Sequence, residues 1–361
     1  MENQKHVGRS AVCEIESIST LDGPHIGNLM KRLIISAPNV AEFEDVPIPE
    51  CPVDGILVCA SATTFSTGTE IRTYLGTSVD PEGRFLYPSR VPLKFPYETG
   101  YSMVGQVIDV GSSTRGFSVG DRVFIGESHK EYAVSETDSA FNLPDSVGTE
   151  QAVFLNILSV GQLALRKALP RPGENVAIIG LGVIGLSTLA FCRAFGFRTL
   201  AIDKDPKRLA IGNAMGADVT AEADSEELHS IVMKWSDGRG ADVVIEAATS
   251  WSAIKTGMDI VRPQGTVVVV ATHTDKPNFS PVSYPYNVKE VILMTSYGYD
   301  LQDERWNRKA CMALSIDLIS RGELDISPML THEIKWHDIP EIYQRIGNGE
   351  KGIVGTLVHW N

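Results

Sequence analysis

The first third of the chain alternates short apolar runs with polar breaks. Between Leu33 and about Val134, runs such as Gly55–Ala60, Gly105–Val110 and Arg122–Ile125 are separated by Gly, Pro, Asp and Ser. Short strands at such close spacing, bounded by turn-forming residues, are typical of antiparallel sheets. This part of the chain is therefore predicted to form a compact, mostly antiparallel β domain.

A different pattern begins near Asn156 and continues to about Ser296. Apolar strand-like segments alternate there with segments of helical periodicity. The strand-like segments are Asn175–Ile179, Thr199–Ile202, Asp242–Ile245 and Gly265–Val270, and the clearest helical ones are Ile184–Phe195 and Pro206–Met215. Strands that are apolar on both faces and alternate with helices predict a parallel sheet covered on both sides. The expected fold class is α/β, with a doubly wound parallel sheet after the β domain.

The two ends of the chain differ from both patterns. From about Tyr297 the sequence is helical again, and it ends in a strand-like run, Ile353–His359. Residues 1–30 show no clear periodicity, and we interpret them as an N-terminal extension. Because 361 residues exceed what one hydrophobic core comfortably holds, two domains are expected.

Composition and charge narrow the choice of partners. No apolar run reaches the roughly 18–20 residues that a membrane-spanning helix needs, and residues 1–20 contain no apolar stretch of secretory-signal length. The net charge of −13 repels nucleic-acid phosphates and anionic lipid surfaces. We therefore expect a cytoplasmic protein that binds a small-molecule substrate, and neither nucleic acid nor membrane.

The five cysteines carry no metal or disulfide pattern. Cys13, Cys51, Cys59, Cys192 and Cys311 are far apart, and none belongs to a Cys-x-x-Cys motif. An odd, scattered set does not predict a disulfide framework. We expect reduced thiols, most of them packed as small hydrophobic side chains.

The sharpest local motif is a glycine-rich turn between a strand and a helix. The buried strand Asn175–Ile179 runs directly into Gly180, Gly182 and Gly185, and Val183 and Ile184 open the helix that follows. In a dinucleotide-binding turn the first glycine makes the tight bend, the second lets the backbone approach the pyrophosphate, and the third allows close helix packing. The phosphates then lie at the helix N-terminus, whose N–H groups favour anions.

An acidic residue at the end of the next strand indicates which dinucleotide binds. Asp203 follows the glycine turn by about twenty residues, the spacing of a ribose-binding acid. A carboxylate there binds the ribose hydroxyls and repels a 2′-phosphate, so NAD is favoured as the cofactor over NADP. Lys204 and Arg208 lie close enough along the chain to keep NADP open. A Rossmann-like domain with another ligand, such as a methyl donor, or with none, is the alternative.

Several further segments together resemble the medium-chain dehydrogenase/reductase superfamily. The resemblance extends over about residues 31–361, and it is nearest to the sorbitol/threonine dehydrogenase branch. Ser66–Glu70 resembles the SGTE-type stretch of bacteriochlorophyllide-dehydrogenase-like members. The segments are Glu44–Glu50, Gly55–Val58, Gly105–Gly111, Phe117–Val123, Arg208–Ala210, Met215–Asp218, Asp242–Ala247 and Val261–Gly265.

This resemblance implies a domain plan and an assembly. The GroES-like, mostly β catalytic domain would comprise residues 1–155 and 298–361, and the Rossmann cofactor domain residues 156–297. A homodimer or homotetramer is expected, paired through an edge strand near Val291–Ser296. The resemblance also implies that Ala248, Thr272 and His273 lie near the cofactor. His273 could instead be a structural or exposed loop residue.

The same resemblance shows where this chain departs from the zinc-dependent members. At the three zinc-ligand segments it has Thr67 for a cysteine, Tyr101 and Ser102 for a His-Glu pair, and Asn156 for a later cysteine or glutamate. None of these side chains is a thiolate, imidazole or carboxylate, the donors that Zn²⁺ prefers. Only six residues separate Val123 from Lys130, so there is no room for the four-cysteine structural zinc lobe. We therefore expect no metal.

Without a metal, protein hydroxyls would have to stabilise charge on the substrate oxygen. Tyr101 and Thr69 are our candidates for polarising a carbonyl or deprotonating an alcohol, with Thr67 as the group that orients them. A phenol with a reference pKa of about 10 needs a nearby cation for this, and Arg72 is one candidate. Alternatively, Tyr101 simply fills the space of the missing metal, and the two threonines bond to backbone.

Glu70, Arg72 and Asn156 complete the candidate site as possible substrate contacts. Glu70 and Arg72 could equally be a solvated ion pair. The leading hypothesis is an NAD(H)-dependent alcohol/ketone oxidoreductase acting on a polar, sugar- or cyclitol-like substrate, an analogy at family level. Metal-free reduction of an activated C=C bond, as in quinone or enoyl reductases, is the alternative enzyme. A non-catalytic nucleotide-binding redox sensor is the alternative of another class.

Overall fold

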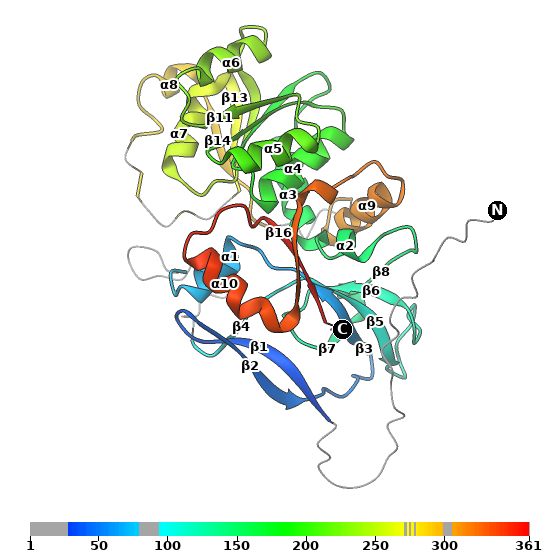
Figure 1. The fold of residues 1–361 in the computed structure, drawn as a ribbon. Helices are drawn as coiled ribbons and strands as arrows, with labels where there is room; N and C mark the ends of the chain where they lie inside the picture. Colours follow the sequence, from blue (N-terminus) through cyan, green and yellow to red (C-terminus); the bar gives the residue numbers. More distant parts are fainter. Residues whose placement is uncertain are drawn as a thin grey trace, which may run out of the picture.

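The computed structural model of the chain describes residues 28–78, 94–270, 273, 276–277, 279–298 and 305–360. Most of the expected N-terminal extension, with Cys13, therefore lies outside the described residues, and so does Thr272. The last residues assigned to the extension already belong to a strand, since β1 begins at Leu29. The described residues form two groups of elements, a mainly β group and an α/β group (Figure 1).

The β group contains the expected antiparallel sheet. Its seven strands run in the order β15-β16-β3-β5-β6-β8, with β7 also pairing with β3. All pairings are antiparallel except that of β15 with β16. The strands are β3 (Gly55–Thr63), β5 (Met103–Val110), β6 (Arg122–Ile125), β7 (Tyr132–Glu136), β8 (Phe141–Asn142), β15 (Leu330–Lys335) and β16 (Gly355–His359).

A smaller antiparallel sheet lies beside it, in the order β2-β1-β4. It consists of β1 (Leu29–Ala37), β2 (Val40–Pro47) and β4 (Tyr97–Glu98). Leu33 and Ile35 of β1 are fully buried, as the period of two along a half-buried strand requires. They share one hydrophobic core with β3, α1 (Thr69–Tyr74) and α10 (Ile339–Gly347).

The α/β group is built on a six-stranded parallel sheet in the order β11-β10-β9-β12-β13-β14. Its strands are β9 (Asn175–Ile179), β10 (Arg198–Asp203), β11 (Val219–Glu222), β12 (Ala241–Glu246), β13 (Val261–Val269) and β14 (Ile292–Thr295). Its helices are α4 (Val183–Ala194), α5 (Pro206–Ala214), α6 (Leu228–Trp235), α7 (Trp251–Ile260) and α8 (Tyr286–Lys289). The order reverses next to β9, so the carboxyl ends of β9 and β12 border the crevice where such sheets bind ligands.

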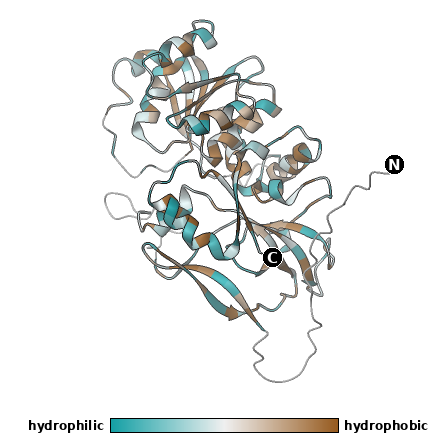
Figure 2. Cartoon of the chain, in the orientation of Figure 1, coloured by the Kyte–Doolittle hydropathy of each residue, from teal (hydrophilic) through white to brown (hydrophobic). Residues whose placement is uncertain are grey.

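Both faces of this sheet are covered, which explains the doubly apolar strands. Ile178 of β9 packs in the core that contains α4, whereas its neighbour Ile179 packs with α6 and α7. Successive residues of a strand point to opposite faces, so each central strand must be apolar throughout. In Figure 2 the central strands are coloured hydrophobic, whereas α10 alternates between hydrophilic and hydrophobic colours.

The remaining helices join the two groups. The helix α3 (Leu155–Ala168) packs against α4 and against α9 (Arg308–Ser320), which follows the parallel sheet in the chain. A short helix, α2 (Thr149–Ala152), precedes α3, and three 3-10 turns cover Thr137–Ser139, Ser327–Met329 and Trp336–Asp338. The chain then returns to the β group through β15, α10 and β16 (Figure 1).

The α/β fold class predicted from the sequence is confirmed. Strands β6 and β9 have the predicted ends, and the other predicted strands begin or end a few residues away. Every strand of the parallel sheet falls inside the range 156–297. No helix among the described residues is both long enough and apolar enough to cross a membrane. Cys192 and Cys311 are buried, Cys51 and Cys59 are half-buried, and burial raises the pKa of the Cys192 thiol.

Candidate active site

A cleft of about 800 Å³ lies between the β group and the parallel sheet. One end is bordered by the glycine-rich turn, the other by the loop that precedes α1 and by Tyr101. Most of the sequence-predicted site residues line it. They are Thr67, Thr69, Arg72, Tyr101, Gly180, Gly182, Val183, Ile184, Asp203, Lys204, Arg208 and Ala248.

The three glycines of the turn are packed as a dinucleotide-binding turn requires. Gly180 has a φ of 94°, which a residue with a side chain rarely adopts. A Cβ on Gly185 would lie 1.8 Å from the carbonyl oxygen of Gly180. In contrast, a Cβ on Gly182 would meet no atom within 4 Å, because it would point into open space. Gly182 also begins α4 without a side-chain cap, which leaves the helix N-terminus available to an anion.

Asp203 lies at the carboxyl end of β10, directly beside this turn. One carboxylate oxygen accepts a hydrogen bond from the backbone N–H of Leu181 at 2.6 Å, and the other accepts one from Asp205 N–H at 2.9 Å. These bonds fix the carboxylate at the cleft wall. The Arg208 guanidinium lies 3.9 Å from it, and Lys204 forms an exposed ion pair with Asp224 at 3.0 Å.

Three buried polar atoms in the cleft have no hydrogen-bond partner among the described residues. They are the Oγ of Ser296, directly after β14, one carboxylate oxygen of Asp205 and the Nε of Arg208. Buried polar groups are normally paired, so a ligand with donors and acceptors would satisfy them. Together with the open face of Gly182 and the position of Asp203, these atoms show that the residues present fit a nicotinamide dinucleotide.

The His273 side chain lies next to the cleft but does not line it, because it contacts other side chains of the protein. Its Nε2 lies 3.0 Å from a carboxylate oxygen of Glu246, and its ring centroid is 5.4 Å from that of Trp251. Glu246, fully buried at the end of β12, also accepts the N–H of Ala248 at 2.9 Å. This environment suits the structural alternative for His273 better than direct cofactor contact.

The end of the cleft formed by the β group is rich in hydroxyl groups. Thr67, Thr69 and Tyr101 line it, and Ser66 and Ser78 add two more. Arg72 contributes a guanidinium to the same wall. The loop and the first turn of α1 bring the threonines together, whereas Tyr101 comes from the segment between β4 and β5. Donors of this kind bind and orient oxygen atoms of a substrate.

Glu70 does not line this cleft, so the expected substrate contact is corrected. The side chain is only 2% exposed. Its Oε1 accepts the N–H of Ser66 at 2.8 Å, and its Oε2 lies within hydrogen-bond distance of three further side chains. Glu70 therefore belongs to the interior. The alternative of a solvated Glu70–Arg72 pair is also wrong, because Glu70 is buried.

The Asn156 side chain likewise does not line the cleft, because its amide group forms hydrogen bonds within the protein. Its amide nitrogen donates to the backbone carbonyl of Tyr101, and its amide oxygen accepts from the Arg308 guanidinium at 3.1 Å. The side chain thus connects α3 to the segment between β4 and β5 that carries Tyr101. The structure supports a role in fixing Tyr101 in place of the expected substrate contact.

The residues at the zinc-ligand positions do not fit a zinc ion. Thr67, Tyr101 and Asn156 offer a hydroxyl, a phenol and an amide, and the cation of Arg308 lies directly beside Asn156. Ser102, at the fourth position, is buried. Within the parts of the chain that the structure describes, no three His, Cys, Asp or Glu side chains gather as metal ligands. Zn²⁺ prefers thiolate, imidazole and carboxylate donors, and none of these four side chains is one of them.

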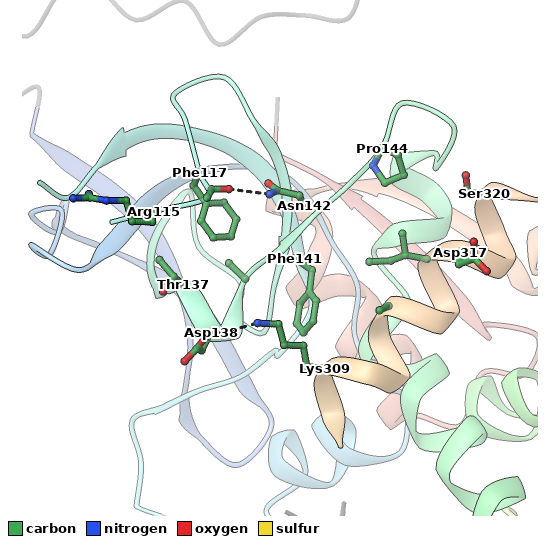
Figure 3. Close-up of a pocket in the computed structure, with 14 residues that line it drawn as sticks. Arg115, Phe117, Thr137, Asp138, Phe141, Asn142, Pro144, Lys309, Asp317 and Ser320 are labelled. Atoms are coloured by element: carbon green, nitrogen blue, oxygen red, sulfur yellow. Dashed lines mark hydrogen bonds and ion pairs between the residues drawn. The ribbon is translucent and has the colours of Figure 1, made fainter. Parts of the chain in front are cut away.

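A second, shallower hollow of about 620 Å³ lies away from the glycine-rich turn, between the β group and α9. Figure 3 shows two interactions among the residues that line it. Lys309 lies 3.8 Å from Asp138, and the Asn142 amide donates to the Gly116 carbonyl. This hollow contains no predicted site residue, so the functional site is placed in the larger cleft.

Some residues of the cleft were not predicted from the sequence. Ser296 could have been found, because it is the last residue of the edge strand expected near Val291–Ser296. Glu350 and Lys351 reach the cleft from the loop between α10 and β16, and no local motif marks them. The fully buried His129, which contacts Glu70, was passed over because it has no ligand-like spacing.

The sequence is similar to that of known dehydrogenases. Residues 183–314 match the family model for zinc-binding dehydrogenases. The chain is 26% identical to the zinc-type alcohol dehydrogenase-like protein YdjJ of Escherichia coli, over 74% of this chain and 84% of that protein. It is 28% identical to the L-threonine 3-dehydrogenase of Shewanella sediminis, over 88% of this chain and 95% of that enzyme.

The fold is also shared with solved structures. An Escherichia coli oxidoreductase/dehydrogenase of unknown specificity superimposes with a TM-score of 0.79 at 22% identity, covering 92% of this chain and 99% of that one. A zinc-binding dehydrogenase of Sinorhizobium meliloti, whose structure contains NADP, gives 0.77 at 20% identity and coverages of 92% and 99%. An Escherichia coli alcohol dehydrogenase in complex with NADH gives 0.77 at 18% identity and coverages of 92% and 100%.

Fold, cleft and sequence similarity agree with one another. The parallel sheet ends in a glycine-rich turn with an acid on the next strand, and the β group supplies the opposite wall of the cleft. The relatives match most of the chain, and so both groups of elements. In sequence and in fold the chain is therefore similar to zinc-type alcohol dehydrogenase-like, NAD(P)-dependent enzymes of the medium-chain dehydrogenase/reductase superfamily.

Proposed function

We propose that the protein is a zinc-independent NAD(H)-dependent oxidoreductase that transfers hydride between nicotinamide and an alcohol or ketone. The observation that carries this proposal is the single cleft that joins the glycine-rich turn to an end lined by hydroxyls. The threonine dehydrogenase among its relatives acts on a hydroxyl-bearing substrate, in keeping with this chemistry. A polar, polyol-like substrate suits the hydroxyl lining, because each substrate hydroxyl needs a partner when it leaves water.

The cofactor would be held by the parallel sheet and its turn. Gly180, Gly182 and the first residues of α4 would bind the pyrophosphate, Asp203 the adenosine ribose, and Ser296 a polar group near the other end of the cleft. When bound, the nicotinamide supplies the hydride acceptor or donor. NAD is preferred in this proposal because the Asp203 carboxylate, fixed by two N–H groups, repels a 2′-phosphate.

The protein's part in the reaction is to hold the substrate oxygen and its proton. The Tyr101 phenol donates a hydrogen bond to that oxygen, and the Thr69 hydroxyl exchanges its proton. Thr67 orients the two groups, and the Arg72 guanidinium on the same wall stabilises negative charge as it develops on the oxygen. Asn156 fixes the backbone of Tyr101 from α3.

Independence from zinc is supported by what surrounds the ligand positions. A divalent cation next to the Arg308 guanidinium, which lies 3.1 Å from the Asn156 amide oxygen, would be repelled. The same donor set also favours one alternative. Reduction of an activated C=C bond needs no metal, so it remains the second candidate, distinguished by its substrates and by a preference for NADPH.

Self-association through the edge of the parallel sheet is part of this proposal. β14 pairs only with β13 within the described sheet. Ile292 on this strand is 52% exposed, and Tyr284 and Val288 nearby in the chain are 81% and 65% exposed. An unpaired edge with exposed apolar side chains is a typical pairing surface, which supports a homodimer or a homotetramer.

The deciding experiment is a fluorescence titration with NADH and NADPH on protein whose metal content is measured in the same sample. Tight NADH binding without stoichiometric zinc, followed by turnover in a screen of polyols and ketones, supports the proposal. Stoichiometric zinc would refute the metal-free mechanism, and preference for NADPH would favour C=C reduction. NADH binding without any turnover would favour the redox-sensor class.

The role of Tyr101 needs its own variant. Tyr101→Phe keeps the ring and removes only the hydroxyl, so we expect kcat to fall by about 10²-fold or more, the usual contribution of a positioned acid–base group. NADH affinity should stay unchanged, because the cofactor is held by the other domain. Unchanged turnover would eliminate Tyr101 as a catalytic residue.

A further inference from the structure

The buried carboxylate of Glu70 lies directly behind the hydroxyl-lined wall of the cleft. Four groups donate to it: Ser66 N–H at 2.8 Å, Thr99 Oγ at 3.0 Å, Tyr343 Oη at 2.6 Å and His129 Nε2 at 3.1 Å. Three of these groups approach Oε2, and Ser66 N–H approaches Oε1, so both carboxylate oxygens have donors. An ionised group can remain buried only when it is satisfied in this way.

His129 links Glu70, through Thr63, to Trp360 near the C-terminal end of the chain. Its Nδ1 lies 2.8 Å from the Thr63 Oγ, and that oxygen also accepts the indole N–H of Trp360 at 2.9 Å. The indole can only donate, so Thr63 Oγ accepts that bond and keeps its hydrogen and one lone pair for His129 Nδ1. A carboxylate can only accept, so the ring's Nε2–H donates to Glu70. The bonds therefore run without a break from Trp360 to Glu70.

Two partners of Glu70, Ser66 and Thr99, belong to the two segments that carry the proposed catalytic hydroxyls. Ser66 directly precedes Thr67, and Glu70 itself follows Thr69 in α1. On the other side, Thr99 lies two residues before Tyr101. Between them, Gly100 has a φ of 101°, and a Cβ there would lie 2.8 Å from His129 Cδ2. The imidazole therefore packs directly on the backbone next to Tyr101.

We propose that Glu70 is a charged anchor that positions both hydroxyl-bearing segments, with His129, Tyr343 and Thr99 as its donors. It is a positioning residue, because it does not line the cleft. The hydroxyl-lined wall of the cleft is thus held from behind by a buried carboxylate with four donors. The inference rests on the proposed function only for its effect on catalysis. Its structural part can be tested without a substrate.

The test compares amide hydrogen exchange in the full-length protein and in Glu70→Gln, by mass spectrometry of peptides covering residues 64–72 and 98–103. Glutamine keeps the size, but its NH₂ group faces donors and cannot accept from them. We expect exchange in both peptides to rise by about tenfold or more, as the loss of a charge-assisted hydrogen bond implies. The matched control is Glu246→Gln, which removes another fully buried carboxylate and should leave these two peptides unchanged.

A milder variant covers the case in which Glu70→Gln does not fold. Tyr343→Phe removes one of the four donors and keeps the buried ring, so a smaller rise, of about threefold, is expected in the same peptides. If neither variant changes exchange in these peptides, or if Glu246→Gln changes it equally, the anchor is refuted, whatever the enzyme's activity proves to be.

Catalysis provides the second readout. With a substrate from the polyol and ketone screen, Glu70→Gln should lower kcat by about 10²-fold, because small displacements of positioned groups have effects of that size. The dissociation constant of NADH, bound by the other domain, should change by less than about twofold. Faster exchange with an unchanged kcat would overturn the positioning role, whereas loss of NADH binding would mean a general structural defect.

Discussion

The glycine-rich turn allows a prediction in which two similar substitutions have opposite effects. Gly182→Ala places a methyl group where no atom lies within 4 Å. The residue has φ −75° and ψ −176°, an extended conformation that alanine adopts freely. The free energy of unfolding should therefore stay the same or rise by up to about 1 kcal/mol, since alanine restricts the unfolded chain.

Gly185→Ala places the same methyl group 1.8 Å from the Gly180 carbonyl oxygen. Within a helix, alanine is preferred over glycine by about 0.8–1 kcal/mol. Relieving the overlap requires the helix and the turn to separate by more than 1 Å, and such overpacking costs about 1–3 kcal/mol or more. The cost of the overlap exceeds the gain in helix propensity. The Gly185→Ala variant should therefore be less stable than the wild type, with a melting temperature lower by several degrees.

Cofactor binding reverses the comparison for Gly182. Its methyl group would occupy the space into which the pyrophosphate must approach the backbone. We expect NADH affinity to fall by at least about tenfold, or 1.4 kcal/mol, in a protein as stable as the wild type. The assays are thermal unfolding without cofactor and NADH fluorescence titration. Wild-type NADH affinity in Gly182→Ala would refute the placement of the pyrophosphate, and wild-type stability in Gly185→Ala would refute the close packing.

Three further predictions concern other parts of the molecule. Asp203→Ser should raise the affinity for NADPH relative to NADH by about tenfold, because the repulsive carboxylate is gone; equal preference before and after, in paired titrations, would contradict its role. Ile292→Lys on the exposed edge of β14 should shift the protein towards monomers in size-exclusion chromatography with light scattering, and an unchanged mass would exclude this edge as the interface. The pKa of Glu98 is lowered: burial acts in the opposite direction but is outweighed by Lys130, Ser128 and Arg32. Because the pKa of Glu98 is lower in the folded state, its carboxylate stabilises the folded protein at pH values above the unfolded pKa of about 4.3. This stabilisation is lost as the pH falls below that value and through the folded-state pKa. Glu98→Gln should therefore weaken the acid dependence of urea unfolding below that pH, and an identical pH profile would contradict this.

Much of the fold could be predicted from the sequence, because its signals are local. Strand β9 and the turn after it follow from an apolar run that meets Gly180, Gly182 and Gly185. The wholly apolar strands imply a sheet covered on both faces, since successive residues of a strand face opposite sides. Asp203 was found by its spacing from the turn, because one strand–helix–strand unit has a nearly fixed length.

The arrangement of polar residues at the hydroxyl-lined end of the cleft could not be predicted in the same way, because it depends on contacts between residues distant in the chain. Glu70 and Arg72 are two residues apart and could not be told apart by sequence, yet Glu70 is buried and Arg72 lines the cleft. The difference arises because Tyr343, 273 positions further along the chain, and His129 meet Glu70 from other elements. Likewise Asn156 bonds to Tyr101 and Arg308, and Lys351 reaches the cleft from the loop before β16.

The sequence by itself therefore determined the α/β class, the glycine-rich turn and the side-chain types at the positions that resemble zinc-ligand positions. Each of these depends on residue identity and short-range spacing. Only the tertiary structure decided which polar residues of the catalytic end face the cleft and which, like Glu70, support it from behind. That distinction depends on burial and on hydrogen-bond partners supplied from distant segments, which no local pattern records.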